Sequence, residues 1–444
     1  MAISSQSEDG VSRPQPFDVG QPIESGLKVK RYLYEHRVHI GAVLAFFLYP
    51  FIYNALTGLP AIGDTIGNFL PATRFMIVVI YLGLFAISFD FISGYTGYLS
   101  FGHAAFFGVG AYFVILATHP DKFALLPQDT PFMITMVIGA TLALIAAILI
   151  GLVSFRLTGV YFAMITLGFA QIMYELVRNW DWIGSNPTDG PGTQISEAYS
   201  IGVPYVDQLS IDLGVIWGSS FENVFGLGFD IGPRVMSYLA IGAVALIAYL
   251  MMQRIIHSPF GRVMIAIREN EERARAVGYN VYWFKLWAFA ISGFFGGIAG
   301  ALAAGYYRAM SPEETFFFLV TAEALITAII GGLGTLAGPL YGMTFFQWLE
   351  DLLSTAADGG FVTFLRDVVP DSIYTADLLG LSMQAFVDNA LDGRSQLYLG
   401  IVFVLFVLFV PNGILGTVRS QIGGKAAEHL PDHLSRYLSG LRDR

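Results

Sequence analysis

The feature that most constrains this chain is a series of long apolar segments separated by short polar stretches. A bilayer core about 30 Å thick is crossed by roughly 20 apolar residues in a helix. Ten segments approach that length, and they cover residues 39–56, 72–93, 95–118, 132–154, 158–177, 233–252, 284–305, 319–335, 338–353 and 395–411. The sequence therefore predicts an all-α, polytopic integral membrane protein with about ten transmembrane helices.

The composition supports this class and argues against others. Of 444 residues, 55% are hydrophobic and 13% are charged, whereas a soluble domain carries about 25% charged residues. A net charge of −10 argues against a nucleic-acid-binding protein, because affinity for phosphates needs a basic surface. The chain has no cysteine, which excludes disulfides, thiolate zinc sites and cysteine nucleophiles.

The distribution of basic residues predicts the orientation. With ten spans and the N-terminus inside, 17 of the 24 Lys and Arg residues lie in inner segments and seven in outer ones. The positive-inside rule then places both termini in the cytoplasm. The predicted organisation is an N-terminal tail (1–38), a transmembrane domain (39–411) and a C-terminal tail (412–444). The weakest spans are 319–335 and 338–353, which could instead form one broken helix with a re-entrant piece.

Two predicted outer loops, 178–232 and 354–394, are rich in acidic residues. They contain Asp181, Asp189, Glu197, Asp207, Asp212, Glu222, Asp230, Asp358, Asp367, Asp371, Asp377, Asp388 and Asp392. One interpretation is an acidic docking face for a partner. The other is solvation of exposed surface, including that of a protein from a high-salt habitat.

The sequence contains no recognisable catalytic motif. Its only Gly-Lys step, Gly424-Lys425, lacks the upstream glycine and the following Ser or Thr of a phosphate-binding loop. There is no HExxH motif, no nucleophile elbow and no cluster with metal-ligand spacing. We expect no enzymatic activity, no metal site and no nucleotide bound by this chain.

Among the ionisable residues inside predicted spans, Asp90, His103 and Glu323 are the candidates for a functional role. Placing a carboxylate in hydrocarbon costs about 2.5–3.5 kcal/mol or more, so each should face protein or water. They could line a solute path or form hydrogen bonds between helices. Both interpretations stay open for the two carboxylates, and packing is favoured for the histidine.

Glycines at short spacings are a further pattern. Small residues three or four positions apart let helices approach closely in lipid. The candidates for this role are Gly94, Gly97, Gly102, Gly293, Gly297, Gly331 and Gly334. The same contacts would permit sliding between helices. The similarity of Gly94-x-x-Gly97-x-Leu99 to Gly331-x-x-Gly334-x-Leu336 is too short to establish an internal repeat.

The predicted cytoplasmic loop 253–281 carries the sharpest signal. Ser258-Pro259 is typical of a helix start and Gly278 of a helix stop. A helix between them would place apolar residues on one side, namely Val263, Ala266, Ile267, Ala274 and Val277. Its acidic residues disfavour an anionic bilayer surface, so we expect this helix to contact another protein.

At this loop the sequence resembles the permease subunits of hydrophobic amino-acid ABC importers, particularly the M-type (LivM-like) subunit of branched-chain amino-acid systems. Four stretches carry the resemblance: Gly94–Tyr112, Tyr161–Phe169, Ser258–Gly278 and Glu323–Pro339. It covers roughly residues 75–345 and the last span, including Pro411–Gly416.

The resemblance implies an importer half in the plasma membrane that moves branched-chain or other hydrophobic amino acids. Its implied partners are a second related permease, two ATPase subunits that carry ATP and Mg, and an external solute-binding protein. The segment from Arg262 to Gly278 would be the coupling helix, which enters a groove on an ATPase subunit. The residues implied there are Arg262, Ala266, Ile267, Glu269, Glu272, Ala274 and Gly278.

Two alternatives remain from the sequence. Permeases of urea or short amides look alike, because selectivity in such systems rests largely on the binding protein. A different class, an ion-coupled secondary transporter, would need an intramembrane ionisable relay and no ATPase. In that class the amphipathic cytoplasmic loop would lack a purpose.

Overall fold

The structure is a computed structural model. It describes residues 37–59, 63, 67, 69–118, 130–180, 200–202, 210–213, 220, 231–353, 377–378, 381–382, 395–410 and 413–417. Most of the two predicted tails and outer loops lie outside these residues, as do eleven of the thirteen acidic residues, all except Asp212 and Asp377. The chain divides into two units, residues 1–49 and 50–444, and the interhelical contacts below lie within the second.

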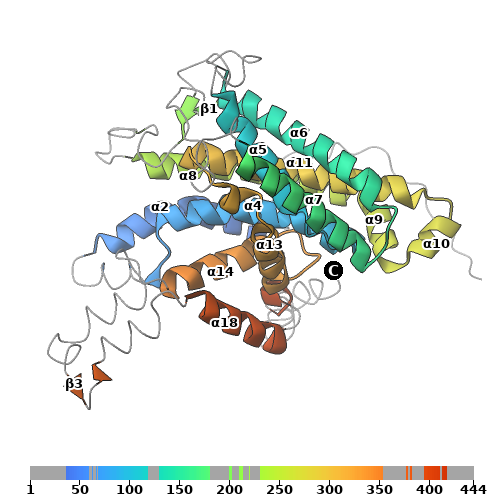
Figure 1. Ribbon diagram of the computed structural model, residues 1–444. Coiled ribbons are helices and arrows are strands. Elements are labelled where there is room, and N and C mark those ends of the chain that lie inside the picture. The colour runs from blue at the N-terminus through green and yellow to red at the C-terminus, as the bar shows by residue number, and fades with distance from the viewer. Residues whose placement is uncertain are drawn as a thin grey trace, which may run out of the picture. The chain divides into compact units, whose positions relative to one another are not determined.

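Helices make up most of the described chain (Figure 1). They are α2 (Arg37–Thr57), α4 (Thr73–Thr96), α5 (His103–Ala117), α6 (Phe132–Ser154), α7 (Val160–Asn179), α8 (Pro233–Ile256), α9 (Pro259–Glu269), α10 (Glu271–Ala276), α11 (Val281–Tyr307), α12 (Pro312–Thr315), α13 (Phe318–Gly331), α14 (Gly338–Leu353) and α18 (Ser395–Phe409). The described strands form two short antiparallel pairs, β1 (Ser200–Gly202) with β2 (Ser210–Asp212) and β3 (Asp377–Leu378) with β4 (Leu381–Ser382). The all-α class is confirmed.

The membrane class is also confirmed. Among the described residues, seven helical stretches are long and apolar enough to cross a membrane, and two shorter apolar helices cover Val43–Thr57 and His103–Ala117. Each of the ten predicted apolar segments coincides with a helix over most of its length. The count of ten spans and the cytoplasmic location of both termini stay predictions.

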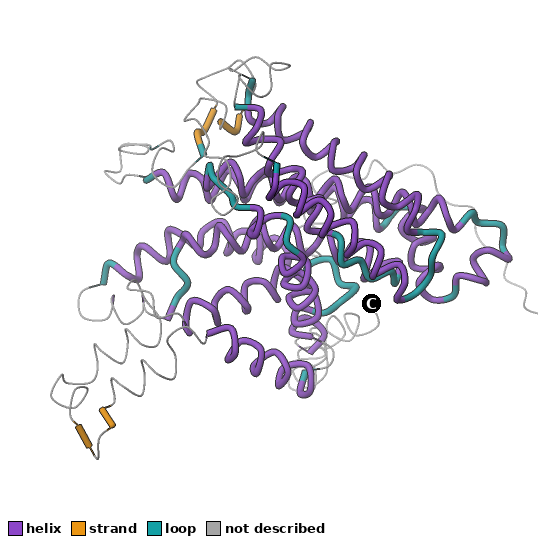
Figure 2. The backbone as a smooth tube through the Cα atoms, in the orientation of Figure 1, coloured by secondary structure: helices purple, strands orange, loops and turns teal. Residues whose placement is uncertain are grey.

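Two predicted spans have different boundaries in the structure. The segment predicted over 95–118 is not one helix, because Gly97 takes a positive φ of 79° and ends α4, and α5 begins only at His103. The segment predicted over 319–335 ends as a helix at Gly331. The residues between α13 and α14 form a connecting loop, drawn in teal in Figure 2.

The core of the second unit is built around α11, which packs against α4, α5 and α6. Close packing follows from small residues on α11. A Cβ added to Gly293 would lie 2.7 Å from Ala147 Cβ, and one added to Gly297 would lie 2.7 Å from Ala143 Cβ. These distances are below normal contact, so the spacing between α11 and α6 requires glycine at both positions.

Other helices leave one side uncovered by protein. Leu149 on α6, Met164 on α7 and Leu408 on α18 are all exposed. In a bilayer these apolar side chains would contact lipid tails, while the backbone polar groups along the span are hydrogen-bonded within the helix. The uncovered faces therefore agree with a chain that crosses the membrane several times.

Candidate functional site

The predicted cytoplasmic loop forms two short helices rather than one. Between α9 and α10, Asn270 has extended backbone angles, φ −161° and ψ 102°. The Asn270 side chain accepts a 2.8 Å hydrogen bond from Arg273 N and so caps α10. The single helix predicted between Ser258 and Gly278 is wrong, because an N-cap asparagine interrupts it.

The apolar residues of this loop are divided between two sides. Val263, Ile267 and Ala274 are buried in one cluster with Val281 at the start of α11, and Phe284 packs against it. We refer to this group as the apolar cluster. Its burial ties α9 and α10 to α11, because apolar area removed from water stabilises by about 25 cal/mol per Å².

The single apolar face predicted for this loop is also wrong. Ala266 and Val277 are exposed, the latter at 73%, while Ile267 and Ala274 face inward. The bend at Asn270 breaks the continuous helical projection on which that face depended. Ile267 and Ala274 therefore cannot contact a partner directly, and their part is to hold the loop.

The exposed side of α9, α10 and the residues that follow mixes apolar and charged groups. Its apolar members are Ile265, Ala266, Val277, Tyr279 and Trp283, and its charged members include Arg262, Glu269 and Glu272. We refer to this set as the outer loop face, because it points away from the rest of the structure; the name does not refer to a side of the membrane. A mixed surface of this kind is typical of protein–protein contacts, in which apolar anchors are rimmed by charges.

Gly278 directs the chain from α10 back towards α11. Its φ is +100°, a conformation that L side chains rarely adopt, and a Cβ added there would meet no atom within 4 Å. Backbone conformation, and not space, therefore selects glycine at this position. The predicted helix stop is confirmed, since α10 ends at Ala276.

A polar network attaches α10 to α11 and to the connection between α4 and α5. Lys285 Nζ donates to Glu271 Oε1 (3.0 Å) and to Tyr98 Oη (2.7 Å), and Tyr98 Oη donates to Glu271 Oε2 (2.7 Å). The Lys285 side chain is 4% exposed. A cation buried this deeply requires such partners.

The Glu271 carboxylate responds to this environment. Burial acts to raise its pKa, but the hydrogen bonds from Tyr98 and Lys285 and the charges of Lys285 and Arg275 outweigh burial. The pKa of Glu271 therefore lies below its ordinary value of 4.5. Sequence reasoning missed this network, although a lysine within the first turns of an apolar helix is a signal for a buried partner.

A second polar junction brings together the two glycine motifs of the sequence. Arg268 Nη1 on α9 donates to Gly94 O, and Asp90 Oδ1 on α4 accepts a 2.8 Å hydrogen bond from Gly334 N. A Cβ added to Gly334 would lie 2.6 Å from Arg268 Nη1, and one added to Gly97 would lie 3.4 Å from Arg268 Cγ. The two motifs therefore leave room for one arginine between them.

The remaining predicted packing glycines lie at close backbone contacts. A Cβ added to Gly102 would be 2.5 Å from Thr166 O on α7. One added to Gly331 would be 1.8 Å from Gly338 O, where the chain leaves α13 and enters α14. Both positions bring backbones closer than any side chain would permit.

His103 lies at the start of α5 in a fully buried position. Its Nε2 is 2.6 Å from Ser292 Oγ on α11, and Ser292 Oγ donates in turn to Ser88 O on α4. Aromatic rings surround the imidazole, including those of Phe89 and Phe106. This geometry joins three helices through hydrogen bonds.

Glu323 on α13 faces α14. Gln347 Nε2 donates to Glu323 Oε1 (3.4 Å) and to Glu350 Oε2 (3.1 Å), so one amide lies between two carboxylates. Within the part of the chain that the structure describes, no group of three or more His, Asp or Glu residues is arranged to hold a metal ion.

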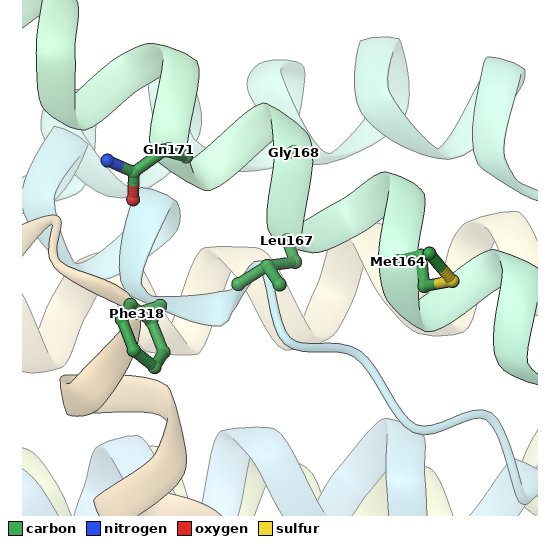
Figure 3. Close-up of a pocket in the computed structure, with 5 residues that line it drawn as sticks. All are labelled: Met164, Leu167, Gly168, Gln171 and Phe318. Atoms are coloured by element: carbon green, nitrogen blue, oxygen red, sulfur yellow. The ribbon is translucent and has the colours of Figure 1, made fainter.

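An open hollow of about 370 Å³ lies between α7 and the start of α13 (Figure 3). It is lined by Met164, Leu167, Gly168, Gln171 and Phe318, the last from α13. The only polar group among these is the Gln171 amide, whose Nε2 donates to Glu175 Oε1 at 3.2 Å. The hollow is thus largely apolar.

Comparison with known proteins identifies a family of transport permeases, which agrees with the membrane class of the fold. Residues 72–373 match the family described as branched-chain amino acid transport system / permease component. The high-affinity branched-chain amino acid transport system permease protein LivM of Escherichia coli K12 is 29% identical over 354 residues, which cover 79% of this chain and 70% of that protein. The ribose import permease protein RbsC of Haemophilus influenzae is 25% identical over 154 residues, 34% of this chain and 46% of that protein.

A third relative matches over a shorter stretch. The probable branched-chain amino acid transport permease protein LivM of Methanocaldococcus jannaschii is 30% identical over 115 residues, 25% of this chain and 32% of that protein. No solved structure matches the chain. The family match covers more than half of the sequence, and the chain therefore belongs to the permease component family of branched-chain amino acid transport systems.

Proposed function

We propose that this chain is the membrane-spanning subunit of an ABC importer in the plasma membrane, and that it moves branched-chain and other hydrophobic amino acids. The observation that carries the proposal is the α9–α10 loop. Its inner side is attached to the helices by the apolar cluster and by two polar junctions, while the outer loop face is left exposed. A loop that is firmly attached to the helices and exposes both apolar and charged groups can bind a partner and transmit its movement to the helices.

The partners we infer are two ATPase subunits on the outer loop face, a second related permease and an external solute-binding protein. Both termini and the α9–α10 loop would lie in the cytoplasm, as the distribution of basic residues predicts. ATP and Mg would bind to the ATPase subunits. This chain would supply the path and the mechanical link, without hydrolysing ATP itself.

The link would work through differential contacts. Closure of the ATPase subunits around nucleotide displaces α9 and α10. The apolar cluster and the Glu271–Lys285–Tyr98 network pass that displacement to α11 and to the connection after α4. The two states of the permease are then populated according to how strongly the ATPase subunits bind each of them.

The buried polar residues fit different parts of this proposal. We infer that His103 and Asp90 hold helices together, since each forms hydrogen bonds between elements. Glu323, next to Gln347 and Glu350, is the candidate for the polar lining of the solute path. Exchange of Glu323 for Gln should then reduce uptake without loss of the folded protein.

The test is reconstitution of the chain in proteoliposomes with its ATPase, second permease and binding-protein partners. We expect uptake of labelled leucine that requires ATP, is inhibited by valine, and is unaffected by urea or ribose. Uptake driven by an ion gradient without ATP would identify a secondary transporter instead. Competition by urea or ribose, but not by valine, would assign a different solute to the same type of importer.

A further inference from the structure

We propose that Arg268 is a positioning residue that passes displacement of α9 directly to α4 and to the loop between α13 and α14. The inference rests on the proposed function, because the displacement would come from ATPase subunits. It adds a route that neither the apolar cluster nor the Glu271–Lys285–Tyr98 network provides, since both of those attach the loop mainly to α11.

The contacts of Arg268 place it between two elements that are far apart in the sequence. Its Nη1 donates to Gly94 O, near the end of α4. Nη1 also lies next to Gly334, in the loop after α13, because a Cβ added to Gly334 would be 2.6 Å from this atom. Gly334 N in turn donates to Asp90 Oδ1 on α4. The Arg268 side chain therefore contacts both α4 and the α13–α14 loop at the point where Asp90 and Gly334 join them.

At this junction the second carboxylate oxygen of Asp90 lacks a hydrogen-bond donor within the described part of the chain. Asp90 is fully buried, and its Oδ2 has no hydrogen-bond partner among the described residues. A guanidinium carries five N–H donors, of which Gly94 O takes one. A buried carboxylate oxygen left without a donor is costly, so it favours any arrangement that brings a donor within reach.

In the proposed role the Arg268 side chain has two arrangements, of which this structure contains the first. In this structure Arg268 donates to the Gly94 carbonyl. When α9 is displaced, a second N–H of the same guanidinium reaches Asp90 Oδ2, and attraction between the two opposite charges favours that arrangement. The absence of a side chain at Gly334 keeps the space beside the guanidinium clear for this movement, and Gly97 leaves room for the Arg268 Cγ. Arg268 thus makes the α13–α14 loop follow α9.

The first experiment compares Arg268→Met with Arg268→Lys in the reconstituted complex. As a matched control, Arg254→Met alters an exposed arginine in the last turn of α8. We expect Arg268→Met to lower the amount of solute imported per ATP about tenfold, Arg268→Lys to lower it about threefold, and the control to stay within twofold. An unchanged ratio in Arg268→Met would overturn the inference.

A second variant covers the case in which Arg268→Met does not fold. Asp90→Asn keeps an acceptor for Gly334 N but removes the charge that attracts the guanidinium. We expect solute imported per ATP to fall about fivefold while the ATPase subunits still co-purify with the chain. Wild-type coupling in Asp90→Asn would contradict the second arrangement of Arg268.

A conformational measurement separates transmission from simple stabilisation. Because the chain has no cysteine, spin labels can be placed at Ala276→Cys on α10 and Tyr341→Cys on α14, both exposed. With Arg268 present, we expect the distance between the labels to keep its distribution when nucleotide binds, because the two helices move together. In Arg268→Met, nucleotide binding should shift or broaden the distribution of distances between the labels. An identical response in both proteins would refute transmission through Arg268.

The outcomes also distinguish this inference from the proposed function. If the unaltered chain neither binds ATPase subunits nor imports solute with ATP, the proposed function fails and the inference fails with it. If the unaltered chain imports normally and both Arg268→Met and Asp90→Asn do the same, only the role of Arg268 is wrong.

Discussion

The α11 core and the α9–α10 loop use glycine for opposite reasons. At Gly297 on α11, a Cβ would lie 2.7 Å from Ala143 Cβ and 2.9 Å from Ala140 Cα, so space is the constraint. At Gly278, a Cβ would meet no atom within 4 Å, but φ is +100°. Glycines of the first kind set the spacing of helices, whereas the second kind sets the direction of the chain. Substitutions should therefore affect folding in the core and coupling in the loop.

The largest effect should come from overfilling the core. Gly297→Val would force α11 away from α6, and overpacking of this kind costs about 3 kcal/mol. Gly168→Val is the matched control, because a Cβ there meets no atom within 4 Å. We expect the first variant to lose most of its folded yield in detergent by size-exclusion chromatography, and the second to keep it. Equal yields would show that the spacing of α11 and α6 does not depend on glycine.

Loss of the buried cation should have the next largest effect. Lys285→Met removes the buried cation bound to Glu271 and leaves the more exposed Arg275 as its charged partner. Hydrogen bonds to charged groups contribute about 2 kcal/mol each. Thermal unfolding of the purified chain should therefore occur at a lower temperature. The double variant Lys285→Met with Glu271→Gln should recover part of the loss, because the partly buried carboxylate that lost its cation is replaced by a neutral amide. A double variant less stable than Lys285→Met alone would contradict this account of the network.

A smaller change in folding, but a clear change in coupling, is expected at Gly278. Gly278→Val imposes strain of about 1 kcal/mol on the positive-φ backbone and should tilt α10. The complex should assemble and the binding protein should still bind solute, while ATP hydrolysis proceeds without uptake. Gly278→Asn is the control, since asparagine tolerates positive φ better. Normal uptake in Gly278→Val would remove the coupling role from this turn.

The smallest effect concerns pH. The folded-state pKa of Glu271 is depressed, so its ionised form contributes stability above about its ordinary value of 4.5. That contribution is lost as the pH falls through the lower folded-state value. The difference in unfolding temperature between the unaltered chain and Glu271→Gln should be constant from pH 6 to 8 and should shrink in more acidic buffer. A difference that grows on acidification would mean that the sign of the shift is wrong.

Local signals in the sequence were enough to predict the membrane class, the positions of most helices and the stop at Gly278. They failed where the outcome depends on contacts between distant segments. The bend at Asn270 had a local signal in its N-cap asparagine, but the apolar pattern on both sides of it suggested one continuous helix. No local pattern could show that Ile267 and Ala274 are buried against Val281.

The polar junctions show the same limit. Asp90 stood out as a carboxylate inside a span, yet its partner, Gly334 N, lies 244 residues away. Arg268 resembled any solvated arginine of a charged loop, because its neighbours Gly94 and Gly334 become apparent only when both motifs are seen together in space. Sequence spacing identifies the unusual residue, and the fold identifies what it contacts.

The central claim is that ATPase subunits contact the outer loop face. A benzophenone attached at Val277→Cys tests it directly, since Val277 is 73% exposed and the chain has no other cysteine. Val404→Cys on α18, also exposed, is the matched control. We predict that light cross-links position 277 of the assembled complex to an ATPase subunit and leaves position 404 without such a product. An assembled, ATP-hydrolysing complex in which position 277 forms no cross-link to the ATPase would contradict the claim.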